Sequence, residues 1–169
     1  MANAWKITSA NLVGAQPIDE TSTTQRHPLG TIVTANSETY GAGEFVYLLG
    51  IANTAVGSVV SWNLQTHITE LCATTKRLPR NIAFAMSANV ASQYGWYQIS
   101  GIAVAKKTAG TCLVAKGAVG VLTTGLIAGT GTGLEVQGAF VAVSASVIST
   151  ARTTVQLVIN RPHMQGRIT

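Results

Sequence analysis

Apolar and polar residues alternate clearly in the stretch that begins at Leu134. Leu134, Val136 and Phe140 fall on one face of an extended strand, whereas Glu135 and Gln137 fall on the other face. Successive side chains of a β-strand point to opposite faces, so this spacing is typical of a strand that is buried on one side. We therefore expect Leu134, Val136 and Phe140 to point into a core.

A second alternating stretch lies later in the chain. Val155, Leu157 and Ile159 share one face, and polar residues such as Thr154 and Gln156 share the other. Antiparallel sheets commonly pack one face on a core and leave the other face to solvent. The two stretches together favour an antiparallel fold.

Short segments rich in β-branched and other apolar residues continue from residue 31 onward, and Gly, Pro, Asn or Ser separates most of them. Nine such segments are typical of a sandwich, a jelly roll or a barrel. The predicted fold class is all-β, with an antiparallel β-sandwich or jelly-roll-like domain. The expected strands are Thr31–Ala35, Glu44–Leu49, Val56–Trp62, Ile82–Ser87, Trp96–Ala105, Thr111–Ala115, Val119–Leu122, Leu134–Ser144 and Thr153–Asn160.

The stretch Leu64–Thr75 is the one helical candidate. Leu64, Ile68, Leu71 and Cys72 recur there at spacings of four and three residues. Its Thr-rich composition speaks against a helix, because β-branched residues lose side-chain freedom in one. A helix, a loop and a strand therefore remain open for this stretch.

Residues 1–28 have no regular apolar spacing, because Pro17, Pro28 and many Asn, Ser, Thr and Gln residues interrupt every apolar piece. We expect an extended N-terminal arm over residues 1–28, followed by a single β-sandwich domain over residues 29–169. Trp5 is the candidate anchor by which the arm lies on a neighbouring molecule. A loose terminus is the alternative.

The chain carries few charges. Only 10% of its residues are charged, against about 25% in an average soluble domain, while 47% are hydrophobic and the mean hydropathy is +0.31. Sheet edges and apolar patches on such a surface are prone to association. The composition favours an obligate oligomer or lattice protein over a monomer with a Thr-rich neutral surface.

The formal net charge is +5, and residues 71–169 hold nine of the eleven Lys and Arg residues. The basic clusters Lys76–Arg80 and Lys106–Lys107 are not interleaved with aromatic residues as nucleic-acid sites are, so we expect no nucleic-acid partner. The closest approach to an apolar span, residues 117–129, is interrupted by Thr and Gly. We therefore expect no membrane partner either.

Motifs for catalysis and for cofactors are missing from the sequence. The three histidines, His27, His67 and His163, lie beside no Ser or Cys motif such as GxSxG, and the chain has only six acidic residues. Cys72 and Cys112 lack the CxxC spacing of a zinc or redox site. We expect a protein that is not an enzyme and that binds no cofactor or metal.

The densest aromatic feature is Tyr94-Gly95-Trp96-Tyr97. Aromatic rings bind sugars and bases by stacking, and Tyr and Trp are also enriched in protein interfaces. In a strand, Trp96 and Tyr97 face opposite sides. We expect one ring to enter the core and the other to reach an interface, with a carbohydrate-binding face as the alternative.

Five stretches carry a resemblance to a known family: His27–Thr31, Tyr40–Leu48, Ala85–Ala91, Gln93–Ile99 and Val158–Pro162. With them the chain resembles the capsid decoration proteins, or cement proteins, of tailed bacteriophages. The resemblance implies a dimer or trimer of this chain on the outside of a shell built by the phage major capsid protein, where it clamps neighbouring capsomers. It also implies a place on the virion exterior, assembly in the host bacterial cytoplasm, and no cofactor.

Three groups of residues are candidates for contacts in such an assembly: an anchor on the arm, an aromatic patch, and basic side chains that meet an acidic capsid surface. They are Trp5; Tyr94, Trp96 and Tyr97; and Arg77, Arg80 and Arg161. The alternative function is a phage head-fibre or tail-tip component that binds a host surface glycan.

Overall fold

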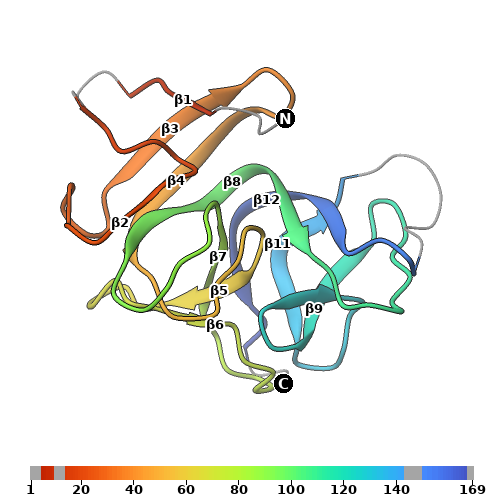
Figure 1. The fold of residues 1–169 in the computed structure, drawn as a ribbon. Helices are drawn as coiled ribbons and strands as arrows, with labels where there is room; N and C mark the ends of the chain where they lie inside the picture. The colour runs from red at the N-terminus through yellow and green to blue at the C-terminus, as the bar shows by residue number, and fades with distance from the viewer. Residues whose placement is uncertain (1–4, 10–13, 143–149, 167–169) are drawn as a thin grey trace.

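The computed structural model describes residues 5–9, 14–142 and 150–166, and within these ranges it contains twelve strands and no helix (Figure 1). The pairs between the strands are antiparallel, which confirms the all-β antiparallel fold class. The strands are β1 (Lys6–Ile7), β2 (Thr21–Ser22), β3 (Ile32–Ser37), β4 (Gly41–Leu49), β5 (Val59–Trp62), β6 (Thr69–Leu71), β7 (Asn81–Ala85), β8 (Tyr94–Lys106), β9 (Ala118–Thr123), β10 (Leu126–Ala128), β11 (Glu135–Val141) and β12 (Thr154–Met164).

Each expected strand overlaps an observed one except residues 111–115, which form no strand. The buried ammonium of Lys107 donates hydrogen bonds to the backbone oxygens of Thr108 (3.1 Å) and Thr111 (2.6 Å). The N–H of Gly117 donates to the backbone oxygen of Val114 at 3.0 Å. These bonds fold the segment into turns in place of a strand.

The stretch from Leu64 to Thr75 is not helical. Asn63 Oδ1 accepts hydrogen bonds from the backbone N–H groups of Gln65 (2.7 Å) and Thr66 (3.2 Å), and His67 follows with a φ of 55°. The left-handed φ of His67 interrupts the helical path after one turn, so the turn capped by Asn63 is not continued as a helix. The helical candidate is therefore wrong, and β6 occupies the middle of the stretch.

The central strand of the sheet is β8, which connects its two halves. Its first half pairs with β4 and β7, and its second half pairs with β12. From β12 the sheet continues through β11 and β9 to β10, and from β7 it continues through β5 to β6. Two isolated parallel bridges close the ends of these two paths. Lys107, just after β8, pairs with Ile127 in β10, and Leu49 in β4 pairs with Ile68, just before β6. The sheet thus curls on both sides of β8 into a sandwich-like arrangement (Figure 1).

Three apolar clusters fill this fold. The largest contains residues of β5, β7 and β8 and of the strands from β9 to β12, with members such as Val121 and Leu157. A second lies between β4, β5, β7 and β8 and includes Tyr97. The third includes Ile18 and Trp96 and lies on the opposite side of β4 and β8. The first half of β8 is therefore buried on both faces.

The N-terminal segment belongs to the third cluster. Gln16 and Ile18 are each only 1% exposed, β2 pairs with β8, and β1 pairs with β3. In the described part of residues 1–28 the chain therefore packs on its own domain, where we expected it to extend away. This packing corrects the expected domain boundary at residue 28.

The two alternating stretches behave differently in the structure. Val155, Leu157 and Ile159 in β12 are all buried, as their spacing predicts. Leu134 and Val136, at the start of the other stretch, are buried as well. Alternation therefore predicts the buried side chains correctly wherever the strand pairing stays regular.

Phe140 is the exception, because it is 43% exposed and does not point into the core. Gly138 has a φ of 75°, and the register between β11 and β12 shifts at this point. A one-residue change of register moves the following side chains to the opposite face of a strand. Ala139 and Val141 consequently take the buried positions, and the ring of Phe140 lies on the outer face.

We expect Gly138→Ala to destabilise the fold by more than about 2 kcal/mol, because the left-handed φ is costly for Ala and the added Cβ would lie 2.7 Å from the backbone oxygen of Asn160. Gly41→Ala, with a φ of +71° and nothing within 4 Å, should lose only the conformational part, about 1 kcal/mol. Gly129→Ala, with open space around it, is the neutral control. Urea unfolding measures the three, and equal stability of Gly138→Ala and Gly129→Ala would contradict the assigned bulge.

Candidate functional site

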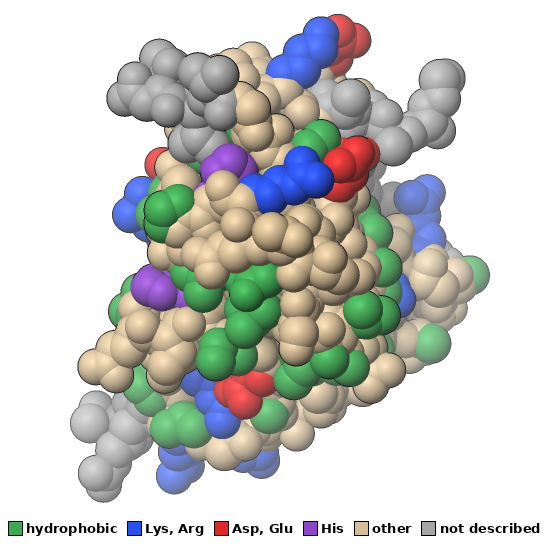
Figure 2. Space-filling view, turned by 60° about the vertical axis from the view of Figure 1, so that its left-hand side comes forward, with side chains coloured by type: hydrophobic (Ala, Val, Ile, Leu, Met, Phe, Trp, Pro, Cys, Tyr) green, Lys and Arg blue, Asp and Glu red, His purple; other side chains and the backbone are tan. Residues whose placement is uncertain are grey.

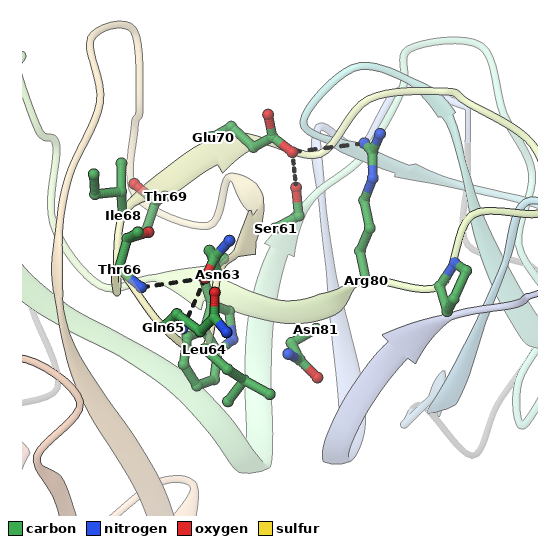
Figure 3. A pocket seen from close by; sticks show the side chains of 12 residues that line it. Ser61, Asn63, Leu64, Gln65, Thr66, Ile68, Thr69, Glu70, Arg80 and Asn81 are labelled. Carbon is green, nitrogen blue, oxygen red and sulfur yellow. Dashed lines mark hydrogen bonds and ion pairs between the residues drawn. The ribbon is translucent and has the colours of Figure 1, made fainter.

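A groove of about 680 Å³ lies beside the connection between β5 and β6 (Figure 3). The turn after β5 forms one wall, and the residues that lead into β7 form the other. Half of its lining side chains carry neutral amide or hydroxyl groups. The lining residues are Ser61, Trp62, Asn63, Leu64, Gln65, Thr66, Ile68, Thr69, Glu70, Pro79, Arg80 and Asn81.

The turn that forms the first wall is fastened to β4. The backbone N–H of His67 donates to the oxygen of Asn63 at 2.8 Å, and the oxygen of His67 accepts from the N–H of Leu49 at 3.1 Å. The hydroxyl of Thr69 donates to the backbone oxygen of Leu49 at 3.0 Å. The backbone of this wall is therefore held in place, while the side chain of Leu64 is 63% exposed beside the groove.

A carboxylate and a guanidinium face each other across the upper part of the groove in Figure 3. Glu70 Oε1 accepts a hydrogen bond from the hydroxyl of Ser61 at 3.0 Å and lies 3.7 Å from Arg80 Nη1. The second distance is that of an ion pair without a direct hydrogen bond. The charges of Glu70 and Arg80 thus offset each other, and the groove has no net charge from its lining residues.

Two buried donors on the walls of the groove have no hydrogen-bond partner. They are Trp62 Nε1 and Arg80 Nη1, and Thr108 Oγ1 is the remaining atom of this kind in the part of the chain that the structure describes. A buried polar group without a partner costs about 1–3 kcal/mol. Trp62 Nε1 is thus a donor without a partner among the residues that line the groove, and Arg80 Nη1 has only its ion pair with Glu70.

A smaller hollow of about 220 Å³ adjoins the groove and shares Trp62, Leu64 and Asn81 with it. Its other walls are apolar apart from Arg161, whose guanidinium is paired with Glu44 at 3.3 Å. On the face shown in Figure 2, hydrophobic side chains gather in the middle, and an acidic side chain lies beside basic ones below them. The two hollows thus form one neutral, partly apolar depression.

The structure buries two of the aromatic residues that we expected at an interface. Trp96 is fully buried, and its Nε1 donates to the backbone oxygen of Gln16 at 2.9 Å. Tyr97 is 1% exposed, its hydroxyl accepts a hydrogen bond from Asn89 Nδ2 at 2.6 Å, and burial raises its pKa to about 12. The two rings do face opposite sides of β8, as predicted, but neither is free to touch a partner. Their assignment to a subunit contact is wrong.

The remaining aromatic candidates pack within the same chain. The ring of Trp5 lies 5.0 Å from that of Phe45 and 6.2 Å from that of Tyr40. The ring of Tyr94 lies 6.3 Å from that of Tyr47. Trp5 therefore anchors the N-terminal segment to the β3–β4 hairpin of its own chain, where we expected an anchor on a neighbour.

The three arginines that we expected to meet a capsid surface occupy different sites. Arg80 lies in the groove and is half-buried, Arg161 pairs with Glu44, and Arg77 is exposed in the turn before β7. Their role in a contact with a partner stays a prediction.

Sequence reasoning missed the residues that form the groove. Trp62 ends an expected strand, and Leu64, Gln65 and Thr66 fall within the helical candidate Leu64–Thr75. Asn63, directly before this candidate, gives no clear signal, because Asn favours both turns and the N-cap of a helix. The other wall comes from Arg80 and Asn81, and its place opposite the turn depends on the pairing of β5 with β7.

Comparison with known proteins gives no family for this chain: none of the family models matches it, and no curated protein matches its sequence. Among the described residues, no helix is long and apolar enough to cross a membrane. Within the same ranges, no three His, Cys, Asp or Glu side chains are grouped so that they could hold a metal ion.

A polar network fastens the N-terminal segment over Trp96. His27 Nε2 accepts a hydrogen bond from the backbone N–H of Gln16 at 3.1 Å, and Gln16 Oε1 accepts one from the hydroxyl of Tyr47 at 2.9 Å. A ring nitrogen that accepts a hydrogen bond carries no proton. Burial, and to a smaller extent the charge of Arg26, lower the pKa of His27 below its ordinary value of 6.5. The neutral histidine is therefore the form that the fold requires.

We expect the stability of the protein to fall as the pH drops below about 6.5, since the unfolded chain then binds a proton that the folded His27 resists. The loss should level off once the pH is also below the lowered pKa of the folded state. Urea midpoints at pH 7.5 and 5.5 measure it, and His27→Gln, which keeps an acceptor but does not titrate, should reduce the difference. His163→Gln, at an exposed position, is the control. An unchanged pH dependence in His27→Gln would contradict the assigned role of His27.

Proposed function

We propose that this chain is a virion structural protein that binds the outer surface of a phage capsid as a homo-oligomer and cements neighbouring capsomers. The support is the resemblance in sequence together with an apolar row on the outer face of the sheet, which is described next. Both call for a partner surface that covers a sparsely charged exterior.

The apolar row consists of Ile102, Val158, Phe140 and Ala118, which lie side by side on β8, β12, β11 and β9. Val158 pairs directly with Ile102 and with Phe140, and Phe140 pairs with Ala118. Residues directly opposite each other on paired strands point to the same face. Val158 and Phe140 each lie between two buried neighbours, so the row lies on the outer face; Phe140 is 43% exposed, Ala118 is exposed, and Ile102 and Val158 are half-buried.

This row is the observation that carries the proposal. The side chain of Gln156, which follows Val158 on the same face of β12, is exposed and neutral. An apolar stripe across four strands suits burial against another protein. A second copy of the chain and a capsid shell are both surfaces of that kind. Repetition of a modest contact around a shell would add up to strong attachment.

A second candidate function is supported by a different feature. The groove beside β6 has unpartnered donors and neutral polar walls, which favour a head-fibre or tail-tip component that binds a host surface glycan. The groove and the apolar row involve different residues. The two functions can therefore be tested separately.

We expect the protein to sediment as a dimer or trimer, and Phe140→Asp to weaken self-association by at least about tenfold, because a carboxylate would be buried in the apolar row. Val90→Asp is the matched control, since Val90 is exposed to 60% but lies outside the row. Analytical ultracentrifugation measures the equilibrium, and an unchanged urea midpoint shows that the variant still folds. A monomeric wild-type protein, or an equal effect of both substitutions, would contradict the role of the row.

Attachment to the shell needs its own measurement. Phage shells that lack the chain should bind the purified wild-type protein in a co-sedimentation assay. Shells that take up none of it would overturn the cementing function, whatever the oligomeric state proves to be.

A further inference from the structure

We propose that the groove beside β6 binds a neutral carbohydrate, with Gln65, Asn81 and Trp62 as residues that contact it. The inference deepens the second candidate function and rests on the groove alone. It does not depend on attachment to a shell. It names both the site and the class of ligand.

The polar groups of the groove fit hydroxyl groups. Asn63, Gln65, Thr66 and Asn81 line it with amide and hydroxyl groups, which both donate and accept hydrogen bonds. A sugar hydroxyl has the same dual character. The side-chain oxygen of Asn63 already accepts two hydrogen bonds within the turn. The side-chain amides of Gln65 and Asn81 are therefore the groups best placed for a ligand, and they lie on opposite walls in Figure 3.

The charges of the groove favour a neutral ligand. Arg80 is the cation of the lining and faces Glu70, the carboxylate of the lining. In the adjoining hollow Arg161 faces Glu44. A phosphate or an acidic glycan would have to compete with these carboxylates for each guanidinium, so neither hollow is built for an anion.

The apolar part of the lining fits the C–H faces of a sugar ring. Leu64 is 63% exposed and Ile68 is 48% exposed, and Pro79 lies on the opposite wall. Small-molecule sites combine such apolar surface with a few placed polar groups and measure about 300–1,000 Å³. The groove, at about 680 Å³, falls within this range.

Two buried N–H groups of the lining residues also suit a sugar hydroxyl. Trp62 Nε1 and Arg80 Nη1 both belong to lining residues, and neither makes a hydrogen bond within the chain, although Arg80 Nη1 lies 3.7 Å from Glu70 Oε1. A sugar hydroxyl oxygen is an acceptor of the kind that both donors need. Binding would therefore satisfy donors that are unsatisfied in the free protein.

The test uses the full chain on an array of neutral bacterial surface polysaccharides, followed by NMR titration with three defined probes. The probes are maltotriose, chitotriose and, as an anionic comparison, a heparin tetrasaccharide. We expect at least one neutral glycan to bind and the heparin fragment not to bind. Polysaccharide binding without binding of either free trisaccharide would place recognition in a longer chain and still support the site.

Gln65→Ala and Asn81→Ala should each weaken binding of the neutral glycan by about tenfold or more. Gln156→Ala, which removes an exposed amide outside the groove, is the matched control and should bind as the wild type does. Unchanged urea midpoints show that the variants fold.

Three outcomes would overturn the inference: no neutral glycan binds, the heparin fragment binds best, or the groove variants bind as tightly as Gln156→Ala. Capture of a peptide or protein by the groove without any glycan would overturn it too. Phe140→Asp should bind glycan normally. Failure of shell attachment and failure of glycan binding are therefore separate results.

Discussion

The burial of β8 on both faces is the constraint on which the rest of the structure depends. Its first half carries Trp96 toward the N-terminal segment and Tyr97 toward β5 and β7, and both rings are almost fully covered. A strand buried on two sides must have every backbone group paired, and β4, β7 and β12 supply these pairs. The remaining strands take their positions from this arrangement.

The N-terminal segment and the groove are two consequences of that constraint. Without residues 14–28, the face of Trp96 and Tyr47 would be open to water, so a segment with little apolar spacing of its own becomes part of the fold. On the other side, the pairing of β7 with both β8 and β5 brings Arg80 and Asn81 opposite the turn that follows Trp62. The groove therefore follows from the sheet topology.

The sequence predicts the fold where local pattern and pairing agree, and it fails where long-range contacts decide. The strand class and the buried face of β12 follow from alternation, and so do the opposite directions of Trp96 and Tyr97. The exposure of Phe140 could not be predicted, because Gly138 allows a register shift that alternation does not reveal. The cover over Trp96 and the two walls of the groove come from segments far apart in the chain.

The sparsely charged exterior and the apolar row on β8, β12, β11 and β9 lead to one central claim, that neighbouring proteins on a virion complete this surface. High-resolution imaging of purified virions from the phage that encodes the chain tests it most directly. The account predicts density for the chain on the outside of the capsid, with the row covered by a neighbouring molecule. Virions without the chain, or with the row facing solvent, would contradict it.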